Sequence, residues 1–309
     1  MKRYFNSYKV RVGALLVFLL MGSSAFAQNV SKKPISNSND PFLAQATATP
    51  TATTATSTTA ATVDEKSKPW SVVVGADQYL GFYENTGQYT SFTLSPSYKI
   101  NDRNTVLIVQ GIDKYYEVPQ INGEEVSFSD MSLRHIYTLF PDINGFSLKW
   151  RASATLPLST VSRDQDNITK LGGMFIASRK FFDVFTLTYK PFISYSVNQF
   201  STTVGGKPLK RGALGNYIEG QIDFTDKLNL FNRFMAQYNS YERVAGDNKP
   251  RQPEGDYLFE SFLGYQVVKN LEAHVGYSYS DSMIKQGRYE MNIYDTEKSR
   301  WLMGVEFNF

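Results

Sequence analysis

The feature that most constrains this chain is an alternation of apolar and polar residues with a period of two, repeated over most of its length. In the stretch 147–159, for example, Leu148 and Trp150 alternate with Lys149 and Arg151. Alternation of this kind is typical of β-strands that have one apolar and one polar face. The chain is therefore predicted to be all-β.

The connections between the alternating segments vary regularly in length, because short turns and longer polar loops follow one another. An even-numbered antiparallel barrel in a bacterial outer membrane has this asymmetry. We therefore predict a closed antiparallel transmembrane β-barrel of about twelve strands, or 10 or 14 if strands merge or split. A soluble β-sandwich is less favoured, because it would not need a charged face on every strand. The predicted strands are 70–82, 89–100, 105–118, 128–140, 147–159, 170–181, 185–200, 214–225, 228–243, 257–268, 271–283 and 300–309.

Three prolines, Pro96, Pro157 and Pro191, fall inside predicted strands. Each lacks the N–H group that a strand donates to its neighbour. We predict bulges at these positions, and a shift of register beyond Pro191 as the strongest case.

The last nine residues carry a more specific pattern, in which apolar or aromatic residues occupy alternate positions up to the final Phe. This pattern resembles the terminal strand of bacterial outer-membrane β-barrel proteins, which typically ends in Phe. The resemblance implies an outer-membrane protein that the barrel-assembly machinery recognises. The residues that would form this assembly signal are Trp301, Met303, Val305, Phe307 and Phe309.

Two segments precede the predicted barrel. Residues 1–27 have a basic start, an apolar run over 12–21 and a small-x-small sequence at 25–27, and are predicted to be a secretory signal peptide. Residues 28–68 are rich in Thr and Ala and are predicted to be a disordered periplasmic tether. The barrel would then occupy 69–309 in the outer membrane, with its long loops extracellular.

Composition excludes several classes of protein. The chain has no Cys, which excludes disulfide scaffolds and thiolate zinc sites. Its formal net charge is +3, but four basic residues lie in the predicted signal peptide, and without them 28 basic residues face 29 acidic ones, a net charge of −1. A nucleic-acid partner is therefore not expected.

The polar faces of the predicted strands give the barrel a charged lumen with two walls of opposite sign. Such walls create a field across the lumen that favours polar or charged solutes over apolar ones. Asp130, Arg233 and Arg300 are exceptions, since each falls on the wall of opposite sign. The predicted basic wall is Lys99, Lys114, Arg134, Lys149, Arg151 and Lys190, and the predicted acidic wall is Asp77, Glu219, Asp223, Glu260, Glu272 and Glu306.

The function that these features favour is a porin-like channel for passive diffusion of small hydrophilic solutes, in contact with outer-membrane lipid. The alternative is a non-transporting barrel, an adhesin, receptor or structural anchor, that acts through loops such as 244–256 and 284–299. The latter loop is long enough to fold inward and narrow the lumen. An enzyme is not expected, because the chain has only two histidines, His135 and His274, and neither has Ser or Asp two residues away. No metal or other cofactor is expected.

Overall fold

A computed structural model of the protein describes residues 68–82, 88–116, 125–203, 206–243, 254–285, 288–289 and 291–309. The predicted signal peptide, and all of the predicted tether except Lys68, lie outside the described residues. No helix in the described ranges has the length and apolarity that a membrane-spanning helix requires.

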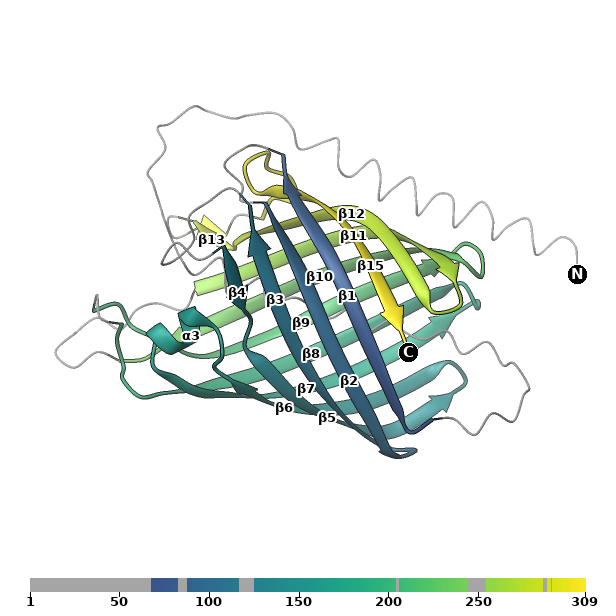
Figure 1. Ribbon diagram of the computed structural model, residues 1–309, viewed down its shortest axis with the longest axis horizontal. Coiled ribbons are helices and arrows are strands. Elements are labelled where there is room, and N and C mark those ends of the chain that lie inside the picture. Colours follow the sequence, from purple (N-terminus) through teal and green to yellow (C-terminus); the bar gives the residue numbers. More distant parts are fainter. Residues whose placement is uncertain are drawn as a thin grey trace, which may run out of the picture. The chain divides into compact units, whose positions relative to one another are not determined.

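Twelve long strands form one closed antiparallel barrel (Figure 1). Each strand pairs with the next along the chain, and β1 pairs with β15 to close the cylinder. The prediction of an all-β barrel of twelve strands is confirmed. The twelve strands are β1 (Trp70–Gly81), β2 (Tyr89–Asn101), β3 (Asn104–Tyr115), β5 (Met131–Ile143), β6 (Phe146–Leu156), β7 (Asn167–Phe181), β8 (Phe185–Asn198), β9 (Lys210–Asp223), β10 (Leu228–Tyr241), β11 (Glu254–Val268), β12 (Leu271–Ser282) and β15 (Ser299–Asn308).

Small elements lie in the longer connections. The strand β4 (Val126–Phe128) pairs with β3, and β13 (Ile284–Lys285) pairs with β14 (Arg288–Tyr289). The one-turn helix α3 (Thr160–Asp164) begins at Ser159, whose side chain accepts a hydrogen bond from the amide of Ser162.

The two faces of the barrel differ in chemistry, as the period of two predicts. On the outer face, Leu94, Leu133, Ile193, Leu214 and Val275 are between 47% and 63% exposed. A belt of exposed aliphatic side chains around a closed sheet is suited to contact with lipid. The residues of the opposite, inner face are mostly half-buried or buried.

Residues from distant strands meet on the inner face. Tyr89 on β2 and Phe262 on β11 belong to one buried cluster with Leu302 and Tyr79, although three strands separate β2 from β11 around the wall. The register explains this cluster, because Tyr89, Tyr79 and Leu302 are opposite one another on β2, β1 and β15, and Gly276 on β12 has no side chain to separate Leu302 from Phe262. The cluster lies on the face opposite the exposed apolar belt, and this face lines the lumen.

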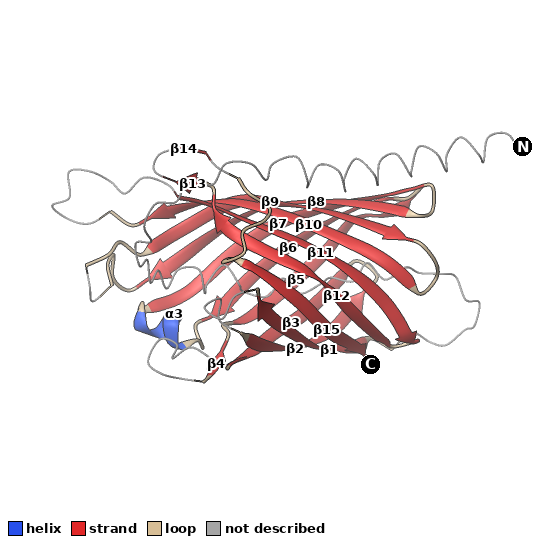
Figure 2. Ribbon diagram, turned by 90° about the horizontal axis from the view of Figure 1, so that it is seen from above, coloured by secondary structure: helices blue, strands red, loops and turns tan. Residues whose placement is uncertain are grey.

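The connections confirm the predicted alternation of short and long. The strands are joined by short turns at 102–103, 144–145, 182–184, 224–227 and 269–270, which lie at one end of the barrel, and the strand ends that border the longer connections lie at the other end (Figure 2). The turn from β5 to β6 is formed by Asn144 and Gly145, with φ of 53° and 78°. A two-residue hairpin loop requires positive φ at both positions, and Asn-Gly is the pair that adopts it most readily.

The expectation of a register shift at Pro191 is wrong. Between β8 and β9, Pro191 lies opposite Asn216, and the register is continuous on both sides of it. Pro96 also lies in continuous register with β1, opposite Val72, and Pro157 follows the end of β6. The barrel therefore absorbs the missing N–H groups without inserting extra residues.

Candidate functional site

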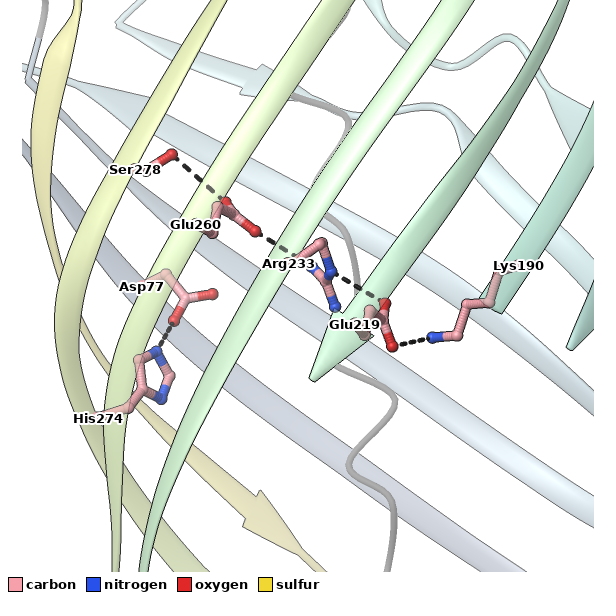
Figure 3. A network of polar contacts seen from close by, with 7 residues as sticks. All are labelled: Asp77, Lys190, Glu219, Arg233, Glu260, His274 and Ser278. Carbon is pink, nitrogen blue, oxygen red and sulfur yellow. Dashed lines mark hydrogen bonds and ion pairs between the residues drawn. The ribbon is translucent and has the colours of Figure 1, made fainter. Parts of the chain in front are cut away.

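Four charged residues form a continuous ion network on the inner face of β8 to β11 (Figure 3). Glu219 accepts hydrogen bonds from Lys190 Nζ at 2.5 Å and from Arg233 Nε at 3.0 Å. Arg233 also reaches Glu260 Oε2 through Nη1 at 3.2 Å. Ser278 on β12 extends the chain by donating to Glu260 Oε1 at 3.4 Å. The network therefore joins five neighbouring strands.

This ion network is almost inaccessible to water, since its four charged residues are between 3% and 7% exposed. A buried charge is tolerated only when it is paired and hydrogen-bonded. Arg233 was an exception to the predicted walls, and its position now has a physical reason. It lies between two carboxylates, Glu219 and Glu260, and bonds to both.

A second polar contact crosses the line where the barrel closes. His274 Nε2 lies 2.8 Å from Asp77 Oδ1, and the two residues come from β12 and β1, with β15 between them (Figure 3). Both lie opposite Gly304 in the strand register. The absence of a side chain at Gly304 leaves the space in which they meet.

Aromatic side chains fill much of the inner face beside these polar groups. Tyr79 and Tyr89 are stacked with ring centroids 4.5 Å apart, and Phe231 and Phe262 are stacked at 4.8 Å. The ring of Phe262 also lies 5.2 Å from that of His274. Aromatic rings at these separations attract each other, and this adds to the stabilisation that comes from burying their apolar area.

Three residues of the predicted basic wall lie together on the inner face of β5 and β6. The register places Arg134 opposite Ser153, Arg151 opposite Ile136 and Lys149 opposite Thr138. No ion pair within the described ranges involves any of the three. Lys190, also in the predicted wall, differs from them because Glu219 pairs with it.

Of the other two predicted members of the basic wall, Lys99 is on the inner face at the end of β2, opposite Thr105, and Lys114 is not on the inner face. Lys114 is opposite Thr90, on the same face as the exposed Phe92, so its expected place in the lumen is corrected to the outer face. Its Nζ lies 5.5 Å from the ring centroid of Tyr116. Lys99 is near the turn after β2 and pairs with Asp102 at 2.9 Å, and this ammonium group lowers the pKa of Asp102.

The predicted acidic wall lies on the inner face throughout, but its members do not form one group. Asp77, Glu219 and Glu260 belong to the two contacts of Figure 3. Asp223 accepts a hydrogen bond from Gln221 at 2.7 Å. The other two members, Glu272 and Glu306, are directly opposite each other on β12 and β15.

The predicted assembly signal occupies the outer face of β15 and the residue that follows it, Phe309. Trp301, Met303 and Val305 are between 44% and 46% exposed, and Phe309 is 60% exposed. The rings of Phe307 and Phe309 pack with centroids 4.3 Å apart. This placement puts all five side chains where lipid or a folding partner would meet them.

The two histidines are on opposite faces. His274 is in the lumen, whereas His135 is opposite Val106 on the outer face and lies 3.0 Å from Asn104 Oδ1. Within the described residues, no three His, Cys, Asp or Glu side chains are grouped so that they would hold a metal ion.

The sequence did not reveal the contacts that fix the long connection between β12 and β15 against β11 and β12. Tyr257 OH donates to the carbonyl of Asn292 at 2.5 Å, and the amide of Asn292 donates back to it at 2.7 Å. Lys298 pairs with Asp281 at 2.5 Å. Tyr257 and Asp281 are directly opposite on β11 and β12 and belong to the outer face, so the described part of this loop packs on the outside of the barrel.

The anchoring residues of this loop gave a weak signal in the sequence. Nothing in the local sequence marks Tyr257, Tyr277 and Tyr279 as residues that hold a loop. Only tertiary contacts distinguish the buried Tyr279, with 0% exposure, from Tyr265, with 49%.

Bacterial outer-membrane barrels are among the solved structures that this fold resembles. An outer-membrane channel from Pseudomonas putida F1 aligns with a TM-score of 0.54 and 11% identity, over 78% of this chain and 95% of that one. The NanC porin aligns with a TM-score of 0.49 and 10% identity, over 76% and 98%. The KdgM porin in complex with disordered oligogalacturonate aligns with a TM-score of 0.44 and 11% identity, over 77% and 99%. No protein-family model and no curated protein matches the sequence.

At such low identity, the likeness concerns the fold. Together with the closed register, the exposed apolar belt and the charged lumen, it defines the class of the protein. The chain is a β-barrel of the bacterial outer-membrane type.

Proposed function

We propose that this protein is an outer-membrane channel through which small hydrophilic solutes diffuse passively. The observation that carries the proposal is the opposition of two faces in one closed cylinder, with exposed apolar side chains outside and charged or polar ones inside. A barrel of eight strands is filled by its own side chains, and one of 16 to 18 strands leaves a wide channel. Twelve strands correspond to a narrow lumen between these limits.

In this proposal the short turns face the periplasm and the long connections face the outside of the cell, the arrangement of outer-membrane barrels in general. Residues 28–68 would then be a tether on the periplasmic side. The proposal includes no catalysis, and it assigns the contact between His274 and Asp77 to the closure of the barrel.

A barrel that transports nothing and acts through its outer loops is the second candidate. The observation in its favour is the burial of the ion network formed by Lys190, Glu219, Arg233 and Glu260, which excludes water from that part of the lumen. Under this alternative the charges would serve only to hold the wall together.

Swelling of liposomes that contain the purified, refolded protein separates the two candidates. A channel predicts swelling in isotonic solutions of small sugars, with a rate that falls as the sugar becomes larger. A refolded barrel that migrates as a heat-modifiable species but causes no swelling with any sugar would contradict the channel and favour the loop-based function.

A further inference from the structure

We propose that Arg134 and Arg151 form an oxyanion-binding site in the lumen, so that the solutes favoured by this barrel carry a carboxylate or phosphate group. The proposal rests on the channel function and names the chemical class of its solutes. It concerns the inner face of β5 and β6, away from the four-residue ion network.

The first observation is that two cationic side chains are neighbours without an acidic partner. Arg134 lies opposite Ser153 and Arg151 opposite Ile136, so the arginines are diagonal neighbours on adjacent strands. Arg134 Nε donates to the hydroxyl of Ser132 at 3.2 Å. Arg151 Nε is buried, and no described residue accepts a hydrogen bond from it.

Such an arrangement is costly unless an anion completes it. Like charges at neighbouring positions of a sheet destabilise the fold, and nearly all buried polar atoms have a hydrogen-bond partner. Glu219 is close enough to Arg151 for an electrostatic interaction, but its carboxylate already accepts from Lys190 and Arg233. The requirement for an acceptor therefore remains at Arg151 Nε, beside the second positive charge of Arg134.

Tyr217 on β9 adds a neutral donor to the same region. It lies near both Arg134 and Arg151, and its ring packs against Phe192 with centroids 5.3 Å apart. Guanidinium and phenolic hydroxyl groups are donors that carboxylate and phosphate groups accept from, and a guanidinium group can do so with two parallel hydrogen bonds.

Further basic residues extend from this site along the lumen wall. Lys149 lies two positions from Arg151 toward the short turns, and Lys170 lies on the inner face of β7 toward the long loops. Among the described ion pairs, neither lysine takes part. Asp130, which interacts electrostatically with Lys170, accepts a hydrogen bond from the Ser162 hydroxyl. Successive weak sites of one sign allow an ion both to enter and to leave a pore.

The test combines ion selectivity with equilibrium binding. In a planar bilayer under a gradient of KCl, the wild-type protein is expected to prefer chloride, and Arg151→Gln is expected to shift the reversal potential toward cation preference. Lys114→Gln is the matched control, because it removes one positive charge from the outer face. Arg151→Lys retains the charge and is expected to keep the anion preference if the barrel folds.

Binding is measured by calorimetry of the folded barrel in detergent, with sodium glucuronate and glucose 6-phosphate as probes and glucose as the neutral control. Either anion should bind, and which binds more tightly distinguishes carboxylate from phosphate recognition. Loss of charge-assisted hydrogen bonds in Arg134→Gln/Arg151→Gln should weaken the Kd by about tenfold or more.

The outcomes separate this site from the channel function. Conductance without anion preference, together with equal binding of glucose and glucuronate, overturns the site and leaves the channel standing. Binding of an anion that depends on both arginines, in a barrel without conductance, supports the site and contradicts the channel. An Arg151→Gln variant that is folded, by its heat-modifiable migration, and unchanged in both measurements also overturns the site.

Discussion

His274 on β12 and Asp77 on β1 are bonded to each other at 2.8 Å across β15, because Gly304 lies between them without a side chain. The two residues are 197 positions apart in the sequence. Since β1 and β15 are the strands at which the cylinder closes, this contact ties three strands together around the closure. A Cβ at position 304 would collide with the Asp77 carboxylate and the His274 ring.

Gly304→Ala should therefore weaken the barrel at its closure. We expect the free energy of unfolding to fall by about 1–3 kcal/mol, because the added methyl group forces the Asp77 and His274 side chains apart. Unfolding in urea, followed by tryptophan fluorescence of the refolded protein, measures the change.

Gly75→Ala is the matched control for this substitution. Gly75 is on the same face of β1, and a Cβ there would meet Thr93 Cβ at 3.9 Å and the Val305 carbonyl at 4.0 Å, which are ordinary contacts. Equal urea midpoints for the two variants would show that the contact across Gly304 contributes no stability.

Because the ion network is buried, a double variant at Arg233 and Glu260 is expected to be more stable than the single variant at Arg233. Arg233→Met leaves Glu219 and Glu260 without their shared partner and should cost about 3–5 kcal/mol. Arg233→Met/Glu260→Gln should be more stable than Arg233→Met, because one unpaired carboxylate is removed while Glu219 keeps Lys190. Urea unfolding of both variants tests the order, and a double variant less stable than the single one would contradict the account.

The twelve strands could be predicted because alternation with a period of two is a local property of the sequence. Which side chains point into the lumen was harder to predict than where the strands lie. Lys114 was misplaced because β3 carries apolar residues on both faces, from Val106 to Val109, so that no clean alternation fixes which side chains point inward. The position of Arg233 between two carboxylates depends on the register of three strands, which no single segment reveals.

The long connection between β12 and β15 shows a second limit of sequence reasoning. Its polar composition is compatible with folding into the lumen, yet Tyr277 OH donates to the carbonyl of Ile293 at 2.6 Å on the outer side of the barrel. The packing of Phe82 against Trp301, with centroids 5.2 Å apart, belongs to the same side. Contacts of this kind depend on strands that are distant in sequence.

Tyr257→Phe should release this loop without changing the lumen. The substitution removes the hydroxyl that bonds to both the amide and the carbonyl of Asn292. We expect faster cleavage by trypsin after Lys298 in the folded barrel, and unchanged conductance.

Tyr265→Phe is the control for the loop, because Tyr265 lies on the same face of β11 and is 49% exposed. If Tyr257→Phe alters conductance while Tyr265→Phe does not, the loop contributes to the lumen, against the arrangement described above.

The outer-face residues of β15 are proposed to direct assembly. Phe309→Ser should reduce the amount of heat-modifiable barrel in the outer-membrane fraction, while export to the periplasm continues, since the barrel-assembly machinery would lose one of the side chains that it recognises. Phe182→Ser is a control, because Phe182 is 74% exposed in a short turn away from β15. Equal amounts of assembled barrel from both variants would remove Phe309 from the assembly signal.

Single-channel recording of the refolded wild-type protein in a planar bilayer tests the central claim most directly. The account predicts discrete steps of conductance of uniform size, produced by a barrel whose heat-modifiable migration shows that it is folded. Folded barrels that insert into the bilayer and pass no current would contradict a channel, and would mean that the charged lumen serves the structure of the wall alone.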